Sequence, residues 1–183
     1  MSEQLKSSCG LLCWLAFAAA VAVGVFLTVG SSKALDATNT TEFCTSCHSM
    51  QWVEEEWMES MHYKNAAGVQ AGCPDCHVPH PLGPKLYAKV MAAKDVWGEI
   101  MGTIDTEEKF EQHRWEMANR VWARMEATDS RECRSCHEFS SMDFSEQEKL
   151  SRKKHKAAEE EGRTCIECHK GVAHEIPDEP DNA

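Results

Sequence analysis

Four copies of the pentapeptide Cys-x-x-Cys-His stand out as residues whose spacing implies chemistry. They comprise Cys44, Cys47 and His48; Cys73, Cys76 and His77; Cys133, Cys136 and His137; and Cys165, Cys168 and His169. This spacing is the attachment signature of c-type haem. The two thiols add across the porphyrin vinyl groups, and the adjacent imidazole becomes an axial ligand of the iron. The sequence therefore predicts four covalently bound haem c groups.

Chance, zinc and disulfides are weaker explanations of these cysteines. With 10 Cys and 9 His in 183 residues, random placement would give about 0.03 such pentapeptides. A zinc site can use paired Cys-x-x-Cys motifs, but it has no need for a histidine directly after every second cysteine. Eight of the 10 cysteines lie in the motifs, which leaves little material for a disulfide framework.

Each haem iron can take a second axial ligand from elsewhere in the chain. Five histidines lie outside the motifs: His62, His80, His113, His155 and His174. The two halves of the sequence resemble each other, which nominates the equivalent pairs His62/His155 and His80/His174. His113 is the weakest candidate of the five. Met50 follows His48 by two residues, and a thioether is also an adequate iron ligand. If Met50 binds the first haem, His62, His155 and His174 suffice and His80 is spare.

An apolar segment near the N-terminus is long enough to anchor the protein in a membrane. Residues 11–29 carry no charge, and a helix of that length crosses the hydrocarbon core. We therefore expect a transmembrane anchor over residues 11–30, after a cytoplasmic N-terminus (1–10). A cleaved signal peptide is the alternative, but residues 34–37 offer no clean Ala-x-Ala site. Because haem c is attached outside the bacterial inner membrane, the remainder is expected in the periplasm.

The rest of the chain is predicted to be mostly α-helical, with little or no β structure. We expect a linker (31–41), a first dihaem half (42–102), a connecting helix (103–130), a second dihaem half (131–177) and a tail (178–183). Asp105, with Glu108 three residues later, is a candidate cap for the connecting helix. Asp143, with Glu146, is the candidate for a later helix that Gly162 closes. The net charge of −11 argues against nucleic acid as a partner.

Beyond the motifs, the phrases CPDCHVPH, GTIDTEEKFEQHR and CIECHKGVAH resemble the NapC/NirT family of membrane-anchored tetrahaem quinol dehydrogenases. The resemblance covers residues 38–177 and the anchor. It implies oxidation of menaquinol or ubiquinol at the membrane and delivery of the electrons to a periplasmic reductase. The NapC type implies nitrate reductase as acceptor and His62, His80, His155 and His174 as distal ligands. The NrfH type instead implies that Met50 ligates the first haem.

The resemblance also implies a quinol site at Lys89 and Asp95, on the helix after the second motif, with Lys85 as a substitute. A carboxylate can accept a quinol proton, and a lysine can stabilise the developing negative charge on the quinol oxygen. Donation to a nitrite, trimethylamine N-oxide or dimethyl sulfoxide reductase is an alternative. Two others are a terminal reductase acting at an open haem face and a passive periplasmic shuttle. A homo-oligomer is also compatible with the sequence.

Overall fold

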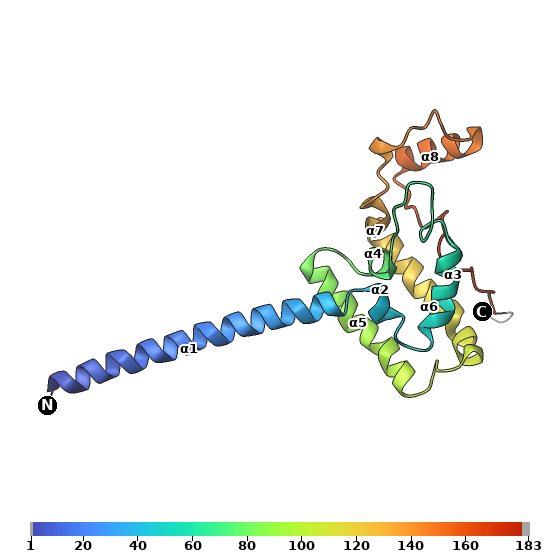
Figure 1. Ribbon diagram of the computed structural model, residues 1–183. Helices are drawn as coiled ribbons and strands as arrows, with labels where there is room; N and C mark the ends of the chain where they lie inside the picture. The colour runs from blue at the N-terminus through green and yellow to red at the C-terminus, as the bar shows by residue number, and fades with distance from the viewer. Residues whose placement is uncertain (1, 181–183) are drawn as a thin grey trace. The chain divides into compact units, whose positions relative to one another are not determined.

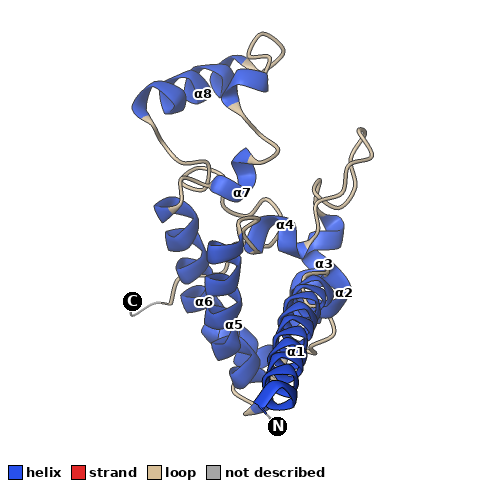
Figure 2. Ribbon diagram, turned by 90° about the vertical axis from the view of Figure 1, so that its left-hand side faces the viewer, coloured by secondary structure: helices blue, strands red, loops and turns tan. Residues whose placement is uncertain are grey.

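The computed structural model describes the backbone of residues 2–180 and the side chains of residues 10–180. Its regular elements within that range are all helices, and it contains no strand there. Figure 2 shows the helices and the loops that join them. The predicted mostly α fold is confirmed. The described residues fall into two compact units, which divide between Thr40 and Thr41.

The first unit is one helix, α1 (Ser2–Ala37). Its stretch Gly10–Ala37 is long and apolar enough to cross a membrane, and none of its most apolar window is buried by protein. The helix continues through most of the segment that we expected to be a linker. Only Thr38, Asn39 and Thr40 therefore separate α1 from the first helix of the second unit.

The second unit carries all four motifs. Its elements are α2 (Thr41–Cys44), α3 (Met50–Glu59), α4 (Cys73–His77), α5 (Leu82–Ile100), α6 (Glu107–Ala127), α7 (Arg131–Arg134), the 3₁₀ turn η1 (Phe139–Ser141) and α8 (Lys149–Glu161). Within this unit α8 lies at one end, whereas α5 and α6 extend towards the other (Figure 1). The predicted connecting segment, residues 103–130, contains α6.

Ion pairs link α6 to both of its long neighbours. Arg114 of α6 binds Glu56 of α3 at 2.6 Å, and only 11% and 17% of these two side chains are exposed. Arg120 binds Asp95 of α5 at 3.2 Å in a more exposed pair. The half-buried Arg114–Glu56 pair is the one that can fix helix positions, because exposed pairs contribute little.

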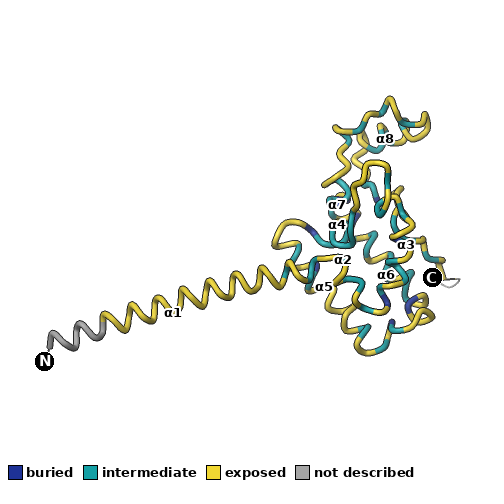
Figure 3. The backbone as a smooth tube through the Cα atoms, viewed as in Figure 1, coloured by how far each residue is buried: buried dark blue, intermediate teal, exposed yellow. Residues whose placement is uncertain are grey.

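Few apolar side chains are buried in the described part of the chain. They are Trp57, Ala88, Ile104, Phe110, Met125 and Ile166. The tube in Figure 3 is accordingly mostly coloured intermediate or exposed. So few buried apolar side chains supply little hydrophobic stabilisation for a unit of this size.

The helix caps differ from the sequence prediction at two places. α6 is capped by Thr106, whose hydroxyl accepts the Lys109 N–H at 3.4 Å. Asp105 instead binds the Lys109 ammonium at 2.7 Å. Asp143 does not begin α8, because its carboxylate accepts the N–H and the hydroxyl of Ser145 in a local turn. Gly162 does close α8, with φ of 65°.

Candidate haem-binding site

Each motif occupies about one tight helical turn. The first begins at the end of α2, the second is α4, the third begins in α7, and the fourth follows α8. The N–H of His137 donates to the Cys133 carbonyl at 2.8 Å, and the N–H of His169 donates to the Cys165 carbonyl at 2.9 Å. The turn gathers the two thiols and the imidazole of a motif within one turn of backbone, as attachment to one macrocycle requires. None of the eight motif cysteines is in a disulfide.

Neighbouring motifs along the chain are also neighbours in space. The Cys44 and Cys73 thiols hydrogen-bond each other, and this bond lowers the pKa of Cys44 to about 7. Burial, and then the nearby Cys133, raise the pKa of Cys76 to about 11. Burial, and then Cys165, raise the pKa of Cys133. In the fold, α2 packs against α4 and α4 packs against α7, and the segment before the third motif bonds to Ile166 of the fourth. The four attachment points therefore follow one another in the order first, second, third, fourth.

A buried hydrogen bond joins the third and fourth motifs. The hydroxyl of the fully buried Ser130 accepts the N–H of Ile166 at 3.1 Å. Asp129 and Ser130 both have positive φ, at 53° and 47°. This turn directs the chain from the end of α6 into the third motif.

Three motif histidines face a distal histidine. His62 faces His137 with ring centroids 6.3 Å apart, His77 faces His174 at 6.1 Å, and His155 faces His169 at 5.8 Å. Two metal–nitrogen bonds of about 2 Å each, plus the distance from each nitrogen to its ring centre, put the centroids of two axial imidazoles about 6 Å apart. These three pairs could each hold one haem iron, so the donor geometry fits haem.

The protein environment keeps the second pair in the form that binds iron. Burial, assisted by His174 and Arg124, lowers the pKa of His77 to about 4. Burial also lowers the pKa of His174, against the opposing charge of Glu56. Both rings are therefore neutral at neutral pH, and a neutral imidazole has a free lone pair for a metal.

Hydrogen bonds fix the orientation of two distal rings. His62 Nδ1 lies 3.3 Å from the Val172 carbonyl oxygen, and His155 Nδ1 lies 2.7 Å from the Gln147 side-chain oxygen. Each oxygen can only accept, so Nδ1 is the protonated nitrogen and Nε2 is left for iron. Metal-binding histidines are commonly oriented in this way.

The half-buried pair between Glu56 and Arg114 holds the segment that carries His174. The Glu175 N–H donates to the Glu56 carboxylate at 3.0 Å, and Arg114 donates to the Glu175 carbonyl at 3.1 Å. His174 Nδ1 lies 3.8 Å from the same carboxylate. The C-terminal segment is thus fastened to α3 and α6 beside the second motif.

The first motif differs from the other three. The aromatic neighbour of His48 is Trp52, 5.8 Å away between ring centroids, and Trp52 in turn packs on Phe110 at 5.2 Å. Met50, the alternative ligand, is partly buried at the start of α3. His80 is exposed, and His113 turns its Nδ1 to the Lys109 carbonyl at 2.8 Å. Among the described residues, neither His80 nor His113 faces a motif histidine. His80 and His174, which were predicted to be equivalent, therefore have different neighbours: only His174 faces a motif histidine.

Glu99 is a residue of this site that sequence reasoning missed. Its Oε1 accepts the N–H of His48 at 3.2 Å and that of Ser49 at 3.5 Å, so it binds the backbone that leads into α3. Its Oε2 is buried without a hydrogen-bond partner in the described part of the protein. The sequence could have indicated Glu99 by its position one helical turn after Asp95, which places both residues on the same side of α5.

We expect Glu99→Ala to loosen the first motif. The loss of an acceptor for two backbone N–H groups should cost about 1–2 kcal/mol of unfolding free energy and lower the thermal midpoint of the holoprotein. It should also alter the electron paramagnetic resonance signal of one haem. Glu99→Gln is the matched control, because its amide oxygen can still accept both bonds. An equal effect of both substitutions would contradict this role.

The two residues proposed for a quinol site lie apart on α5. The Lys89 ammonium is 5.9 Å from the centre of the Phe43 ring, and its charge helps to lower the pKa of Cys44. Lys89 is therefore beside the first motif. Asp95 is held by Arg120 of α6, and Lys85 is only partly exposed near the start of α5. The structure does not bring Lys89 and Asp95 into contact with each other.

Four adjacent attachment motifs and three facing histidine pairs on a helical scaffold define a multihaem c-type cytochrome. The protein-family model described as "NapC/NirT cytochrome c family, N-terminal region" matches residues 6–179 of this chain. This chain belongs to that family. Members of the family are membrane-anchored, which agrees with the length and apolar character of α1.

Several curated relatives are similar over most of their length. A protein described as tetraheme cytochrome-c type from Allochromatium vinosum is 56% identical over 183 residues, which is all of both chains. The denitrification system component NirT from Stutzerimonas stutzeri is 51% identical, over 86% of this chain and 79% of the relative. The cytochrome c-type protein NapC from Escherichia coli is 48% identical, over 85% and 78%. No solved structure matches the chain.

Proposed function

We propose that this protein takes electrons from quinol in the membrane and delivers them to a reductase in the periplasm. When bound, haem supplies the one-electron redox chemistry. The observation that carries the proposal is the surroundings of the first motif. The Lys89 ammonium lies beside it, and its histidine, His48, has no second histidine ring facing it in the described part of the protein. The first motif is therefore the place where a substrate can approach.

The chain supplies groups suited to quinol oxidation. Quinol loses two electrons and two protons as it becomes quinone. The Lys89 ammonium can hydrogen-bond the quinol oxygen and stabilise its negative charge as the proton leaves. A carboxylate can receive one of the two protons, and we assign this role to Asp95, which Arg120 holds at 3.2 Å. The other proton goes to water.

For the irons, we infer three bis-histidine sites and one exception. The pairs are His77/His174, His62/His137 and His155/His169, as supported by their centroid separations of 6.1, 6.3 and 5.8 Å. The first haem takes its protein ligand from the segment that contains His48 and Met50, and His80 takes no part.

The similarity to NapC and NirT relatives, at 48% and 51% identity, supports a periplasmic reductase as the electron acceptor. We take periplasmic nitrate reductase as the first acceptor to test. The haem domain is assigned to the periplasm, with α1 as the single anchor in the inner membrane.

The test is reduction of the oxidised, detergent-solubilised protein by a menaquinol analogue under anaerobic conditions, followed at the haem α-band. We expect rapid reduction of part of the haem, and dithionite should then reduce the remainder. Full reduction by dithionite with none by quinol would refute the proposal. It would favour a shuttle that another protein reduces.

A further inference from the structure

The charge distribution on α8 points to a second functional surface. Residues 149–156 contain Lys149, Arg152, Lys153, Lys154 and Lys156, which are five of the 19 basic residues in a chain of net charge −11. All four lysines are exposed. Lys149, Lys153 and Lys156 share one side of the helix, since they follow one another at intervals of four and three residues. We call these five residues the α8 basic cluster.

This charge order does not serve the stability of the helix. A helix favours acidic residues in its first turn and basic residues in its last. α8 has no acidic residue in its first turn and no basic residue in its last, where Glu159, Glu160 and Glu161 stand instead. The basic residues near its start and the glutamates at its end are unfavourable to the helix dipole, and only Glu148 at the N-cap has the favourable sign. Within residues 149–161, no side chain forms an ion pair that would offset this effect.

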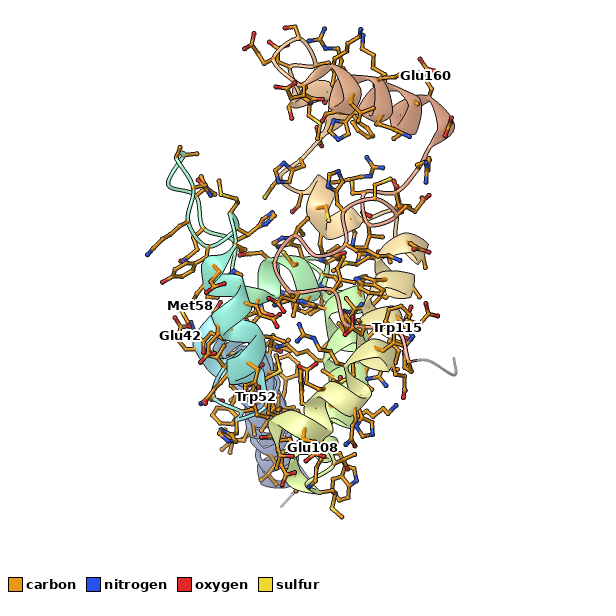
Figure 4. The ribbon with its side chains drawn as sticks, turned by 90° about the vertical axis from the view of Figure 1, so that its right-hand side faces the viewer. Glu42, Trp52, Met58, Glu108, Trp115 and Glu160 are labelled. Atoms are coloured by element: carbon orange, nitrogen blue, oxygen red, sulfur yellow. The ribbon has the colours of Figure 1, made fainter. Side chains whose placement is uncertain are left out.

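The α8 basic cluster lies beside the fourth haem-attachment motif. His155 lies within it and faces His169 of the fourth motif at 5.8 Å. Arg152 donates to the carbonyls of Ser145 and Gln147, and the Gln147 side chain orients His155. The fourth motif is the last in the spatial order that starts beside Lys89. Figure 4 shows Glu160 of α8 at the opposite end of the domain from Glu108.

We propose that the α8 basic cluster is the docking surface for the soluble electron acceptor, and that it binds an acidic patch around the acceptor's redox centre. This inference rests on the proposed function, because it places the exit of electrons at the fourth motif. Opposite charges speed the encounter of two proteins and fix their orientation. An uncharged or basic contact surface on the acceptor would gain nothing from this cluster.

The test uses acidic plastocyanin as a defined acceptor. The holoprotein is reduced with dithionite, freed of excess reductant, and mixed with Cu(II) plastocyanin, so that each productive encounter moves one electron from haem iron to copper. The variant Lys153→Glu/Lys156→Glu reverses two charges beside His155. The control Lys64→Glu/Lys94→Glu changes the net charge equally, at two exposed lysines that are not part of α8.

At low ionic strength we expect the α8 variant to lower the second-order rate constant roughly tenfold. The control should change it less than about twofold, and the variant should approach the parent protein at high salt. With basic mitochondrial cytochrome c as acceptor, the α8 variant should react faster than the parent. Equal effects of the two variants, or no effect of either, would overturn the proposal.

The same preparations separate this inference from the proposed function. Reduction by the menaquinol analogue should be the same in the parent and in the α8 variant. If quinol reduces none of them, but the α8 variant still selectively slows oxidation by plastocyanin, the quinol proposal fails and the docking surface stands. If quinol reduces all of them and the α8 variant does not slow oxidation, the docking surface alone fails.

Discussion

His174→Ala is expected to convert the second haem from a low-spin to a high-spin centre. It removes the ring that faces His77 at 6.1 Å, and the alanine side chain supplies no replacement ligand. Because three bis-histidine sites are proposed, the low-spin bis-histidine signal in electron paramagnetic resonance should fall by about one third. The altered potential at the second position should slow quinol-driven turnover by roughly tenfold or more.

His80→Ala is the matched control for this change. His80 is exposed and faces no motif histidine, so the spectrum and the turnover should both remain those of the parent protein. A loss of low-spin signal in His80→Ala with none in His174→Ala would contradict the proposed pairing. It would favour the ligand set that the NapC type implies.

Lys89→Ala is expected to slow reduction by quinol roughly tenfold to hundredfold, the range for removal of one donor to a developing oxyanion. The Lys89 ammonium lies beside Phe43 and Cys44 at the first motif, whereas reduction by dithionite does not need it. The measurement is the rate of α-band growth after mixing with a menaquinol analogue. Lys94→Ala is the control on the same helix, since Lys94 only approaches Glu116 at 4.0 Å on the surface. A similar loss in both variants would remove Lys89 from the quinol site.

For Asp95, a structural role and a chemical role can be separated. Asp95→Asn and Arg120→Gln both break the ion pair between α5 and α6. Only Asp95→Asn also removes the carboxylate that is proposed to accept the proton. We expect Asp95→Asn to slow quinol oxidation and Arg120→Gln to leave it within about threefold of the parent rate. Equal slowing would mean that Asp95 acts only through the packing of the helices.

The features that sequence predicted best are those set by covalent or local chemistry. A haem attachment needs its two thiols and one imidazole within five consecutive residues, so spacing alone located all four motifs. Helix periodicity and the absence of alternating strands predicted the mostly α fold. Gly162 was found as a helix end because glycine readily adopts the positive φ that the position requires.

The features that sequence could not supply depend on distant segments. Duplication suggested that His62 and His155 are equivalent, yet His155 faces the motif that follows it, whereas His62 faces His137 across the domain. Glu99 has no motif of its own, and it acquires its place only because α5 packs beside the backbone of His48. The predicted caps at Asp105 and Asp143 were wrong. The Asp105 carboxylate binds Lys109, and the Asp143 carboxylate accepts the Ser145 N–H in a local turn.

The pairing of His62 with His137, and of His77 with His174, bears on the order in which the protein can be assembled during export. The second motif crosses the membrane early during export. His174, which faces the histidine of that motif, lies close to the C-terminus. In the proposed ligand set, His174 would therefore reach the second haem only after nearly the whole polypeptide has been translocated. A chain truncated after the third motif would keep three attachment motifs. It would lack His174, the proposed second ligand of the second haem.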